Sequence, residues 1–124
     1  MANTYTPRFG VGANQDSTGR VLVYNYAEPA YVATLAIVPN AYQSLYNCKT
    51  LTGAQTINAT VSGSQVGDVL KFIFVSDSTG RTVTFGTGFT DSAATIAVTA
   101  SKKAYIDFIF DGVAFIETGR VIEA

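Results

Sequence analysis

Asp107 and Asp111, near the C-terminus, are the residues whose type and spacing come closest to a catalytic pair. Glycoside hydrolysis needs only two carboxylates, held about 5 to 9.5 Å apart depending on the mechanism. Four residues along an extended strand span roughly 13 Å, which is too far for either mechanism. Asp111 is also explained by the turn that it begins with Gly112. A small hydrolase that uses these carboxylates is therefore the weakest hypothesis for this chain.

Other catalytic and ligand-binding chemistry lacks the residues that it needs. The chain has no histidine, which excludes Ser-His-Asp and Cys-His arrangements and histidine metal sites. Cys48, the single cysteine, can form neither an intrachain disulfide nor a thiolate metal site, and we expect it to be buried. Gly10-Val11-Gly12 lacks the third glycine and the preceding strand of a dinucleotide-binding motif. We predict no enzyme activity, no catalytic residue, no cofactor and no metal.

Charged residues are sparse and dispersed. They make up 14% of the 124 residues, against roughly 25% in an average soluble domain, while hydrophobic residues make up 48%. Two explanations stay open: a surface made polar by Thr, Ser and Gly, or a surface that other chains cover. Among the eight Lys and Arg residues only Lys102 and Lys103 are adjacent. We expect no nucleic-acid partner, because phosphate binding needs a concentrated basic face.

The sequence gives no targeting or membrane signal. The N-terminal Met-Ala-Asn-Thr-Tyr-Thr-Pro-Arg has no basic-then-apolar signal architecture. No apolar run approaches the roughly 18 residues of a membrane span. We therefore expect synthesis in the cytoplasm and no membrane insertion.

Beyond Thr50 the chain alternates between apolar and polar side chains in short segments. This alternation, with turn residues between the segments and no helical periodicity, predicts a sandwich or barrel. The expected strands are residues 56–62, 69–76, 81–85, 93–100, 105–110 and 113–117. We expect residues 69–85 to form one hairpin and residues 105–117 another, the second around Asp111-Gly112. The fold class is predicted to be all-β, an antiparallel β-sandwich or jelly-roll-like small domain over residues 49–124.

Residues 1–48 differ in composition, and we expect them to form an extended N-terminal segment for attachment or interface contacts. They hold all three prolines and six of the seven tyrosines: Tyr5, Tyr24, Tyr26, Tyr31, Tyr42 and Tyr46. Tyrosine offers a large amphipathic contact area at little entropic cost, which suits an interface. Alternatively these tyrosines flank strands of the same domain, since residues 20–26 and 31–38 resemble strands. Residues 40–47 are expected to form a short helical turn.

One short sequence repeats. Residues 16–20, Asp-Ser-Thr-Gly-Arg, recur as residues 77–81, each time before an alternating apolar stretch. Two identical loops could present one ligand-binding surface twice, or both could be the same tight turn built from the same residues. The longer flanks do not match, so we expect no duplicated domain.

A receptor- or glycan-binding module is a hypothesis from a different class. Such modules expose aromatic platforms on β-sandwiches, and Tyr105, Phe89 and Phe115 are candidates for this role. The chain has no tryptophan, a favoured stacking residue. Each of these aromatic residues could instead lie in the core or in an interface.

Several runs after Thr50 carry a family resemblance. Residues 52–58 (TGAQTIN), 67–74 (GDVLKFIF) and 79–85 (TGRTVTF) are similar to a small β-domain of tailed-phage virion proteins. Residues 106–115 (IDFIFDGVAF) look like the closing hairpin of that domain, with Phe115 where the domain often has Trp. The resemblance covers somewhat over half of the chain. It implies a component of tail fibres, head fibres or capsid decoration proteins, commonly a homotrimer, with no cofactor.

The leading hypothesis is therefore a bacteriophage capsid decoration or head-fibre protein, located in the virion, that acts through assembly contacts. The small size of the chain favours these two types over a long, repetitive tail fibre. The expected partners are copies of itself, as a homotrimer, and the major capsid protein or other virion proteins, with residues 1–48 as the docking segment. For the alternative, a binding module of a fibre, the partner is a surface glycan. We expect no membrane partner.

Overall fold

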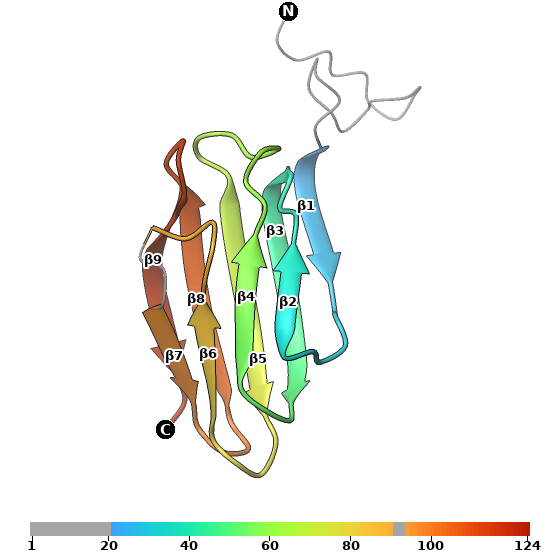
Figure 1. Cartoon of the computed structure of the whole chain (residues 1–124), viewed down its shortest axis with the longest axis vertical. Helices are drawn as coiled ribbons and strands as arrows, with labels where there is room; N and C mark the ends of the chain where they lie inside the picture. The colour runs from blue at the N-terminus through green and yellow to red at the C-terminus, as the bar shows by residue number, and fades with distance from the viewer. Residues whose placement is uncertain (1–20, 91–93) are drawn as a thin grey trace, which may run out of the picture.

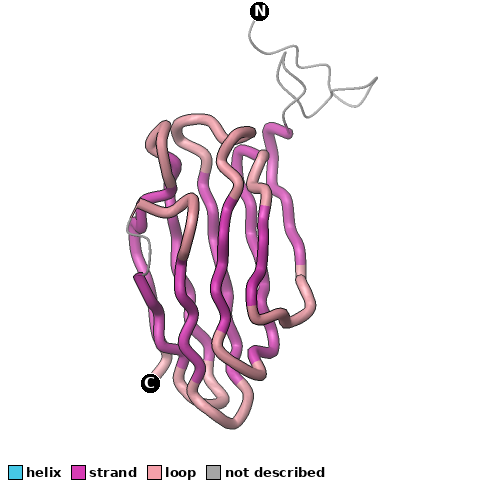
Figure 2. Tube along the Cα trace, in the orientation of Figure 1, coloured by secondary structure: helices cyan, strands magenta, loops and turns pink. Residues whose placement is uncertain are grey.

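Nine β-strands and no helix make up the regular structure of residues 21–90 and 94–124, which are the residues that the computed structural model describes. The strands are β1 (Val21–Ala27), β2 (Thr34–Ile37), β3 (Ala41–Leu51), β4 (Gln55–Ala59), β5 (Val69–Ser76), β6 (Arg81–Phe85), β7 (Ala94–Val98), β8 (Lys103–Phe110) and β9 (Phe115–Ile122). Most of the loops lie at the two ends of the strands (Figure 2). The prediction of an all-β chain is confirmed, and these residues contain no helix able to cross a membrane.

The strands form two sheets that lie face to face (Figure 1). The five-stranded sheet has the order β1-β3-β5-β8-β9, and the four-stranded sheet, in front in Figure 1, has the order β2-β4-β6-β7. Alternate side chains of each sheet point inward, so that in β5 every second residue is buried. Packing the two inner faces against each other removes both from water, which is why one chain needs two layers.

From β1 to β6 the chain changes sheet after every strand. As a result, β1, β3 and β5 run parallel in one sheet, and β2, β4 and β6 run parallel in the other. Parallel neighbours need a crossover connection, and here each crossover is a strand of the opposite sheet. The antiparallel pairs β5–β8, β6–β7 and β8–β9 complete the two sheets. The prediction of an antiparallel sandwich is therefore wrong for the first six strands, and both sheets are mixed.

The connection at residues 77–80 explains why the hairpin predicted for residues 69–85 is wrong. β5 and β6 lie in different sheets. The N–H of Asp77 donates to the carbonyl of Leu51 at 3.1 Å, and the carbonyl of Asp77 accepts from the N–H of Ser101 at 2.7 Å. The connection is thus hydrogen-bonded to the end of β3 and to the loop between β7 and β8. A hairpin within one sheet and an arch between two sheets produce the same alternation, because alternation reports only which side chains face inward.

The closing hairpin predicted from Asp111-Gly112 is confirmed. β8 and β9 pair antiparallel, the N–H of Asp111 donates to the carbonyl of Ala114 at 3.1 Å, and Gly112 has a φ of +104°. An Asp-Gly pair determines such a turn locally, since glycine adopts positive φ without a steric penalty.

β3 occupies the residues for which a short helical turn was predicted, and that prediction is wrong. The strand is hydrogen-bonded to β1 on one side and to β5 on the other, and two-sided pairing outweighs a weak local preference. The boundary predicted between residues 48 and 49 falls inside β3. Residues 21–48 contribute β1, β2 and most of β3 to the same two sheets as the rest of the chain.

Phenylalanine rings from both sheets join the two layers. Phe72 and Phe108 of the five-stranded sheet and Phe85 of the four-stranded sheet have ring centroids 5.0, 5.7 and 5.9 Å apart, in tilted and edge-to-face arrangements. All three side chains are buried. Replacing a buried Phe with Ala typically costs about 3–5 kcal/mol, so this cluster is a major source of the stability of the body.

Gly88 lets the link between β6 and β7 pass close to β4. Its φ is +90°, and a Cβ here would meet the backbone oxygen of Ala59 and, at 2.9 Å, the Ala59 Cβ. We predict that Gly88→Ala lowers the free energy of unfolding by about 2–4 kcal/mol, measured by urea denaturation. Gly80→Ala, between β5 and β6, is the matched control, because a Cβ there comes no closer than 3.4 Å to another atom and Gly80 has no positive φ. The control should change the free energy by less than about 1 kcal/mol, and equal effects of the two substitutions would contradict this account.

Candidate assembly surface

The outer face of the five-stranded sheet is apolar. Side chains that alternate with the core residues of this sheet point to its outer side, and most of them are aliphatic or aromatic. The apolar outer face consists of Tyr26, Leu45, Val69, Ile73, Val75, Tyr105, Ile109, Ile116 and Val121. Tyr26 is 44% exposed and Val121 is 62% exposed. A contiguous exposed apolar surface on a small domain marks a site of contact with another molecule.

Strand register gathers these side chains into continuous rows. Val69 of β5 lies opposite Ile109 of β8. In a second row, Ile73 of β5 lies opposite Tyr105 of β8, which lies opposite Val121 of β9. Residues directly opposite each other on one face of a sheet have Cβ atoms about 4.5–5.5 Å apart, so the side chains of each row lie side by side.

One pair of charges lies between these two rows. Lys71 of β5 is directly opposite Asp107 of β8, on the same outer side of the sheet. Among the described residues no ion pair joins them. Two opposite charges therefore lie next to each other between two rows that are apolar on β5, β8 and β9 and end in Gln43 and Asn47 on β3.

The outer face of the four-stranded sheet has the opposite chemistry. Thr34, Thr56, Thr84 and Thr95 form one row across all four strands. Hydroxyl groups stay hydrogen-bonded to water, so this face suits the solvent-exposed side of a sheet. The hydroxyl-rich surface of the first explanation thus lies on the four-stranded sheet, whereas the five-stranded sheet exposes apolar side chains.

The tyrosines predicted for an interface do not form one surface in the described residues. Tyr26 belongs to the apolar outer face, where its hydroxyl accepts a hydrogen bond from Asn47 Nδ2 at 3.1 Å. Tyr42 is 54% exposed near the start of β3. Tyr5 and the side chain of Tyr24 lie outside the described residues.

Two other tyrosines of that group have structural partners. Tyr46 packs on the core, with its ring stacked on Phe72 at a centroid distance of 5.7 Å, and burial raises the pKa of its hydroxyl. The hydroxyl of Tyr31 donates to the carbonyl of Ala54 at 2.7 Å. Both contacts match the alternative that these tyrosines flank strands of the same domain.

The prediction missed the aliphatic residues of the outer face, although β5 carries a signal for them. Val69, Ile73 and Val75 alternate with Phe72 and Phe74, so apart from Lys71 both sides of this strand are apolar. A strand with one side in water normally alternates between apolar and polar residues. A strand with two largely apolar sides departs from that pattern.

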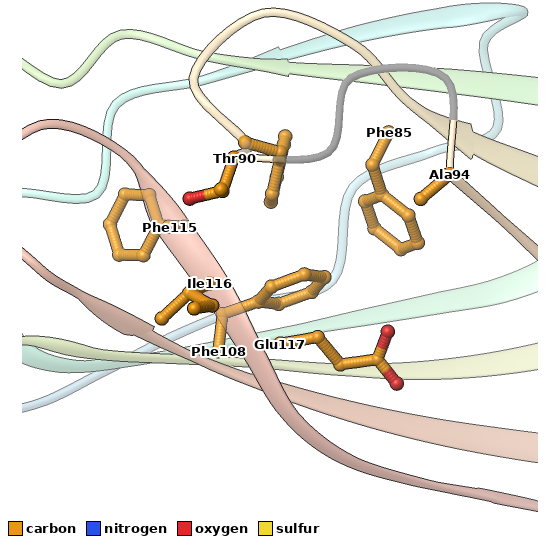
Figure 3. A pocket seen from close by; sticks show the side chains of 8 residues that line it. Phe85, Thr90, Ala94, Phe108, Phe115, Ile116 and Glu117 are labelled. Atoms are coloured by element: carbon orange, nitrogen blue, oxygen red, sulfur yellow. The ribbon is translucent and has the colours of Figure 1, made fainter.

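A pocket of about 300 Å³ opens between the sheets at the edge formed by β7 and β9 (Figure 3). Its lining includes four aromatic and two polar side chains: Phe85, Phe89, Phe108, Phe115, Thr90 and Glu117. The carboxylate of Glu117 accepts hydrogen bonds from Arg120 Nε and Nη2 at 2.6 and 2.8 Å, which lower its pKa. Arg120 Nη1 also donates to the carbonyl of Thr95 on β7 at 2.9 Å. A carboxylate held ionised in this way is unsuited to general acid catalysis.

Two of the three aromatic residues proposed as a glycan platform are buried. Phe89 is 6% exposed and Phe115 is 1% exposed, and both belong to the core. Their assignment as exposed platforms is therefore wrong. Tyr105 is 38% exposed, on the apolar outer face.

The structure gives Asp107 and Asp111 separate surroundings. The carboxylate of Asp111 accepts hydrogen bonds from the N–H groups of Val113 and Ala114 at 2.8 and 2.9 Å, and these bonds lower its pKa. Asp111 thus stabilises the hairpin turn, whereas Asp107 lies along β8 opposite Lys71. Within residues 21–90 and 94–124 no cluster of three or more acidic, histidine or cysteine side chains could hold a metal ion.

The second copy of the repeated sequence, residues 77–81, is a turn that its own side chains stabilise. The carboxylate of Asp77 accepts from the N–H of Thr79 at 3.2 Å and from Arg81 Nε and Nη2 at 2.9 and 2.7 Å. Asp and Arg are thus needed by the turn itself, which supports the turn alternative for this copy. Residues 16–20 lie outside the described residues.

These bonds predict a pH dependence of stability. Hydrogen bonds from Arg81 lower the pKa of Asp77, so stabilisation by this carboxylate is complete above about pH 5 and is lost as the pH falls through its native pKa. Asp77→Asn removes the charge and keeps an acceptor for Thr79. The difference in unfolding free energy between wild type and variant should be constant from about pH 5 to 7 and shrink below about pH 4. Urea denaturation between these limits measures it, and a difference that does not vary with pH would contradict the role of Asp77.

Cys48 is buried, as predicted, and burial raises the pKa of its thiol to about 12. The thiolate is the reactive form, so this shift lowers the reactive fraction at pH 8 on the order of 10³-fold relative to a free cysteine. We predict negligible reaction with a chromogenic disulfide reagent in the native state and complete reaction in 6 M guanidinium. Rapid labelling of the native protein would show that the core opens readily around β3.

Comparison with protein-family models finds no match for this chain, and comparison with curated proteins finds none either. The similarity to tailed-phage virion domains therefore stands on the motifs of residues 52–115 alone. We therefore infer function from the chemistry of the two outer sheet faces.

Proposed function

We propose that this chain is a structural protein of a bacteriophage virion, of the capsid decoration or head-fibre type, and that it acts through assembly contacts without a cofactor. Its partners are copies of itself and the major capsid protein or other virion proteins. The motifs in residues 52–115 support the virion assignment by resemblance. The two sheet faces support a role in assembly.

The single observation that carries this proposal is the difference between the two outer faces. Both faces belong to one chain. A row on the four-stranded sheet is threonine, whereas two rows on the five-stranded sheet are valine, isoleucine and tyrosine on β5, β8 and β9, with Gln43 and Asn47 on β3. Exposed apolar surface is costly in water at about 25 cal/mol per Å². An exposed apolar face of this extent is typical of a site of contact with another molecule.

Properties of the interior also suit a passive structural role. The Phe cluster joins the two sheets, and the closing hairpin and the Asp77–Arg81 turn hold two of their connections. A body of this kind presents a fixed surface, and a fixed surface loses little conformational entropy when a partner binds.

The alternative, a receptor- or glycan-binding module, has less support. Of its three proposed aromatic residues only Tyr105 is exposed, and Tyr105 lies in a row between Ile73 and Val121. Sugars stack on an aromatic ring whose neighbours offer hydrogen bonds, whereas aliphatic neighbours favour another apolar surface. A glycan array with purified protein tests this alternative, which requires a clear sugar preference that Tyr105→Ala abolishes.

Incorporation into particles tests the proposed function. Particles of the encoding phage, purified on a density gradient, should contain the chain as a stoichiometric component detectable by immunoblotting. We predict that Ile109→Asp, which places a charge on the apolar outer face, lowers incorporation at least 10-fold because the charge would have to be buried without a partner.

Thr82→Asp on β6 is the matched control, since it places the same charge on an interior strand of the other sheet. It should be incorporated like the wild type, and circular dichroism should show both variants folded. Absence of the wild-type chain from purified particles would overturn the virion assignment. Equal incorporation of Ile109→Asp and wild type would overturn the role of this face.

A further inference from the structure

The partner of the apolar outer face can be deduced from the order of residues in one register row. Along this row, Leu45 of β3 lies opposite Lys71 of β5, Lys71 lies opposite Asp107 of β8, and Asp107 lies opposite Gly119 of β9. Across these four strands the row reads bulky, positive, negative, empty, and Tyr26 of β1 extends it beyond Leu45. When these four residues are rotated by 180° about an axis parallel to the strands, the bulky residue comes over the empty position and each charge comes over the opposite charge.

We propose that the apolar outer face binds the same face of a second copy of this chain, around a two-fold axis that runs parallel to the strands between β5 and β8. Such an axis places Lys71 of each copy over Asp107 of the other. It also places Leu45 of each copy over Gly119 of the other. A two-fold interface requires self-complementarity of this kind, because each surface patch must match itself.

Each of the two contacts fills a gap that the single chain leaves. Lys71 and Asp107 form no ion pair with each other within the described part of the chain, so both remain able to pair across the interface. At Gly119 a Cβ would meet nothing within 4 Å, which leaves room for an incoming side chain. Two ion pairs related by symmetry would fix the register of two otherwise uniform apolar faces.

The size of the face is sufficient for a stable pair. The axis between β5 and β8 superposes the four strands β3, β5, β8 and β9, and with strands about 4.8 Å apart and alternate residues about 6.8 Å apart, four rows give an overlapping area of roughly 500 Å². Two faces together bury roughly 1,000 Å², which is the lower limit for a specific protein interface. Two sheets stacked at about 10 Å bring side chains of this length into contact.

One end of the face is polar, as the rims of other protein interfaces are. Lys49 forms an ion pair with Glu28 at 3.2 Å at one margin, and Lys103 lies opposite Val75 at the same end. Such a rim stays in water while the apolar centre is covered. This inference identifies the partner for the assembly role proposed above and rests on that role, but it concerns the purified protein alone.

Charge reversal with a mixed-variant rescue tests the pair. Size-exclusion chromatography with light scattering on the full chain at about 100 μM should give twice the 13.1 kDa of one chain. Lys71→Glu and Asp107→Lys should each weaken the pair at least 100-fold and elute as monomers, because each creates two like-charge contacts. An equimolar mixture of the two variants should restore the dimer, since every contact across the interface then joins opposite charges.

Further variants separate loss of pairing from loss of folding. Lys71→Glu/Asp107→Lys, with the charges exchanged, should dimerise like the wild type, and Thr82→Glu on the other sheet should leave the dimer unchanged. Thermal unfolding followed by circular dichroism shows whether each variant is folded. Rescue by the mixture needs two folded monomers, so it cannot arise from misfolding.

Three outcomes would overturn the two-fold pair: a wild-type monomer at 100 μM, a trimer of three times the chain mass, or a dimer that both charge reversals leave intact. A trimer would instead agree with the arrangement that the phage resemblance implies. A dimer of a chain that purified particles lack would overturn the virion function and keep the pair. A monomeric chain that purified particles do contain would overturn the two-fold pair and keep the virion function.

Discussion

The packing of the two inner sheet faces against each other is the constraint on which the rest of this structure depends. Phe72 and Phe108 on one sheet meet Phe85 on the other, and their burial supplies the free energy that holds the layers together. The chain satisfies this requirement by changing sheet after each of its first five strands. Neighbouring strands of one sheet are therefore distant in sequence and parallel, and no helix is needed to connect them.

That constraint also determines which residues form the outer surfaces. Side chains of a strand alternate, so choosing the inner set assigns every other residue to the outside. On the four-stranded sheet the outer set includes the threonine row from Thr34 to Thr95, which water can solvate. On the five-stranded sheet it includes the rows of valine, isoleucine and tyrosine. One stable core thus carries two outer faces of different chemistry.

The strands after residue 50 could be predicted from the sequence because their alternation is a local property. The hairpin at Asp111-Gly112 could be predicted for the same reason, since two residues determine its turn. The sheet in which each strand lies could not be predicted. Asp77-Ser78-Thr79-Gly80 has turn chemistry whether the chain folds back or arches across, and the choice depends on partners such as Leu51 and Ser101 that are distant in sequence.

The candidate surface was harder to predict than the fold, and β5 shows the physical reason. Its outer side carries Val69, Ile73 and Val75, but Lys71 interrupts them and gives that side the appearance of a solvent-exposed one. Only the register with β8 places Asp107 beside Lys71. A lone charge within an apolar surface opposes burial, whereas a charge beside its opposite can pair across an interface and be buried with its partner. Lys71, which makes the outer side of β5 look solvent-exposed in the sequence, is therefore also the residue whose charge would align this face in the proposed pair.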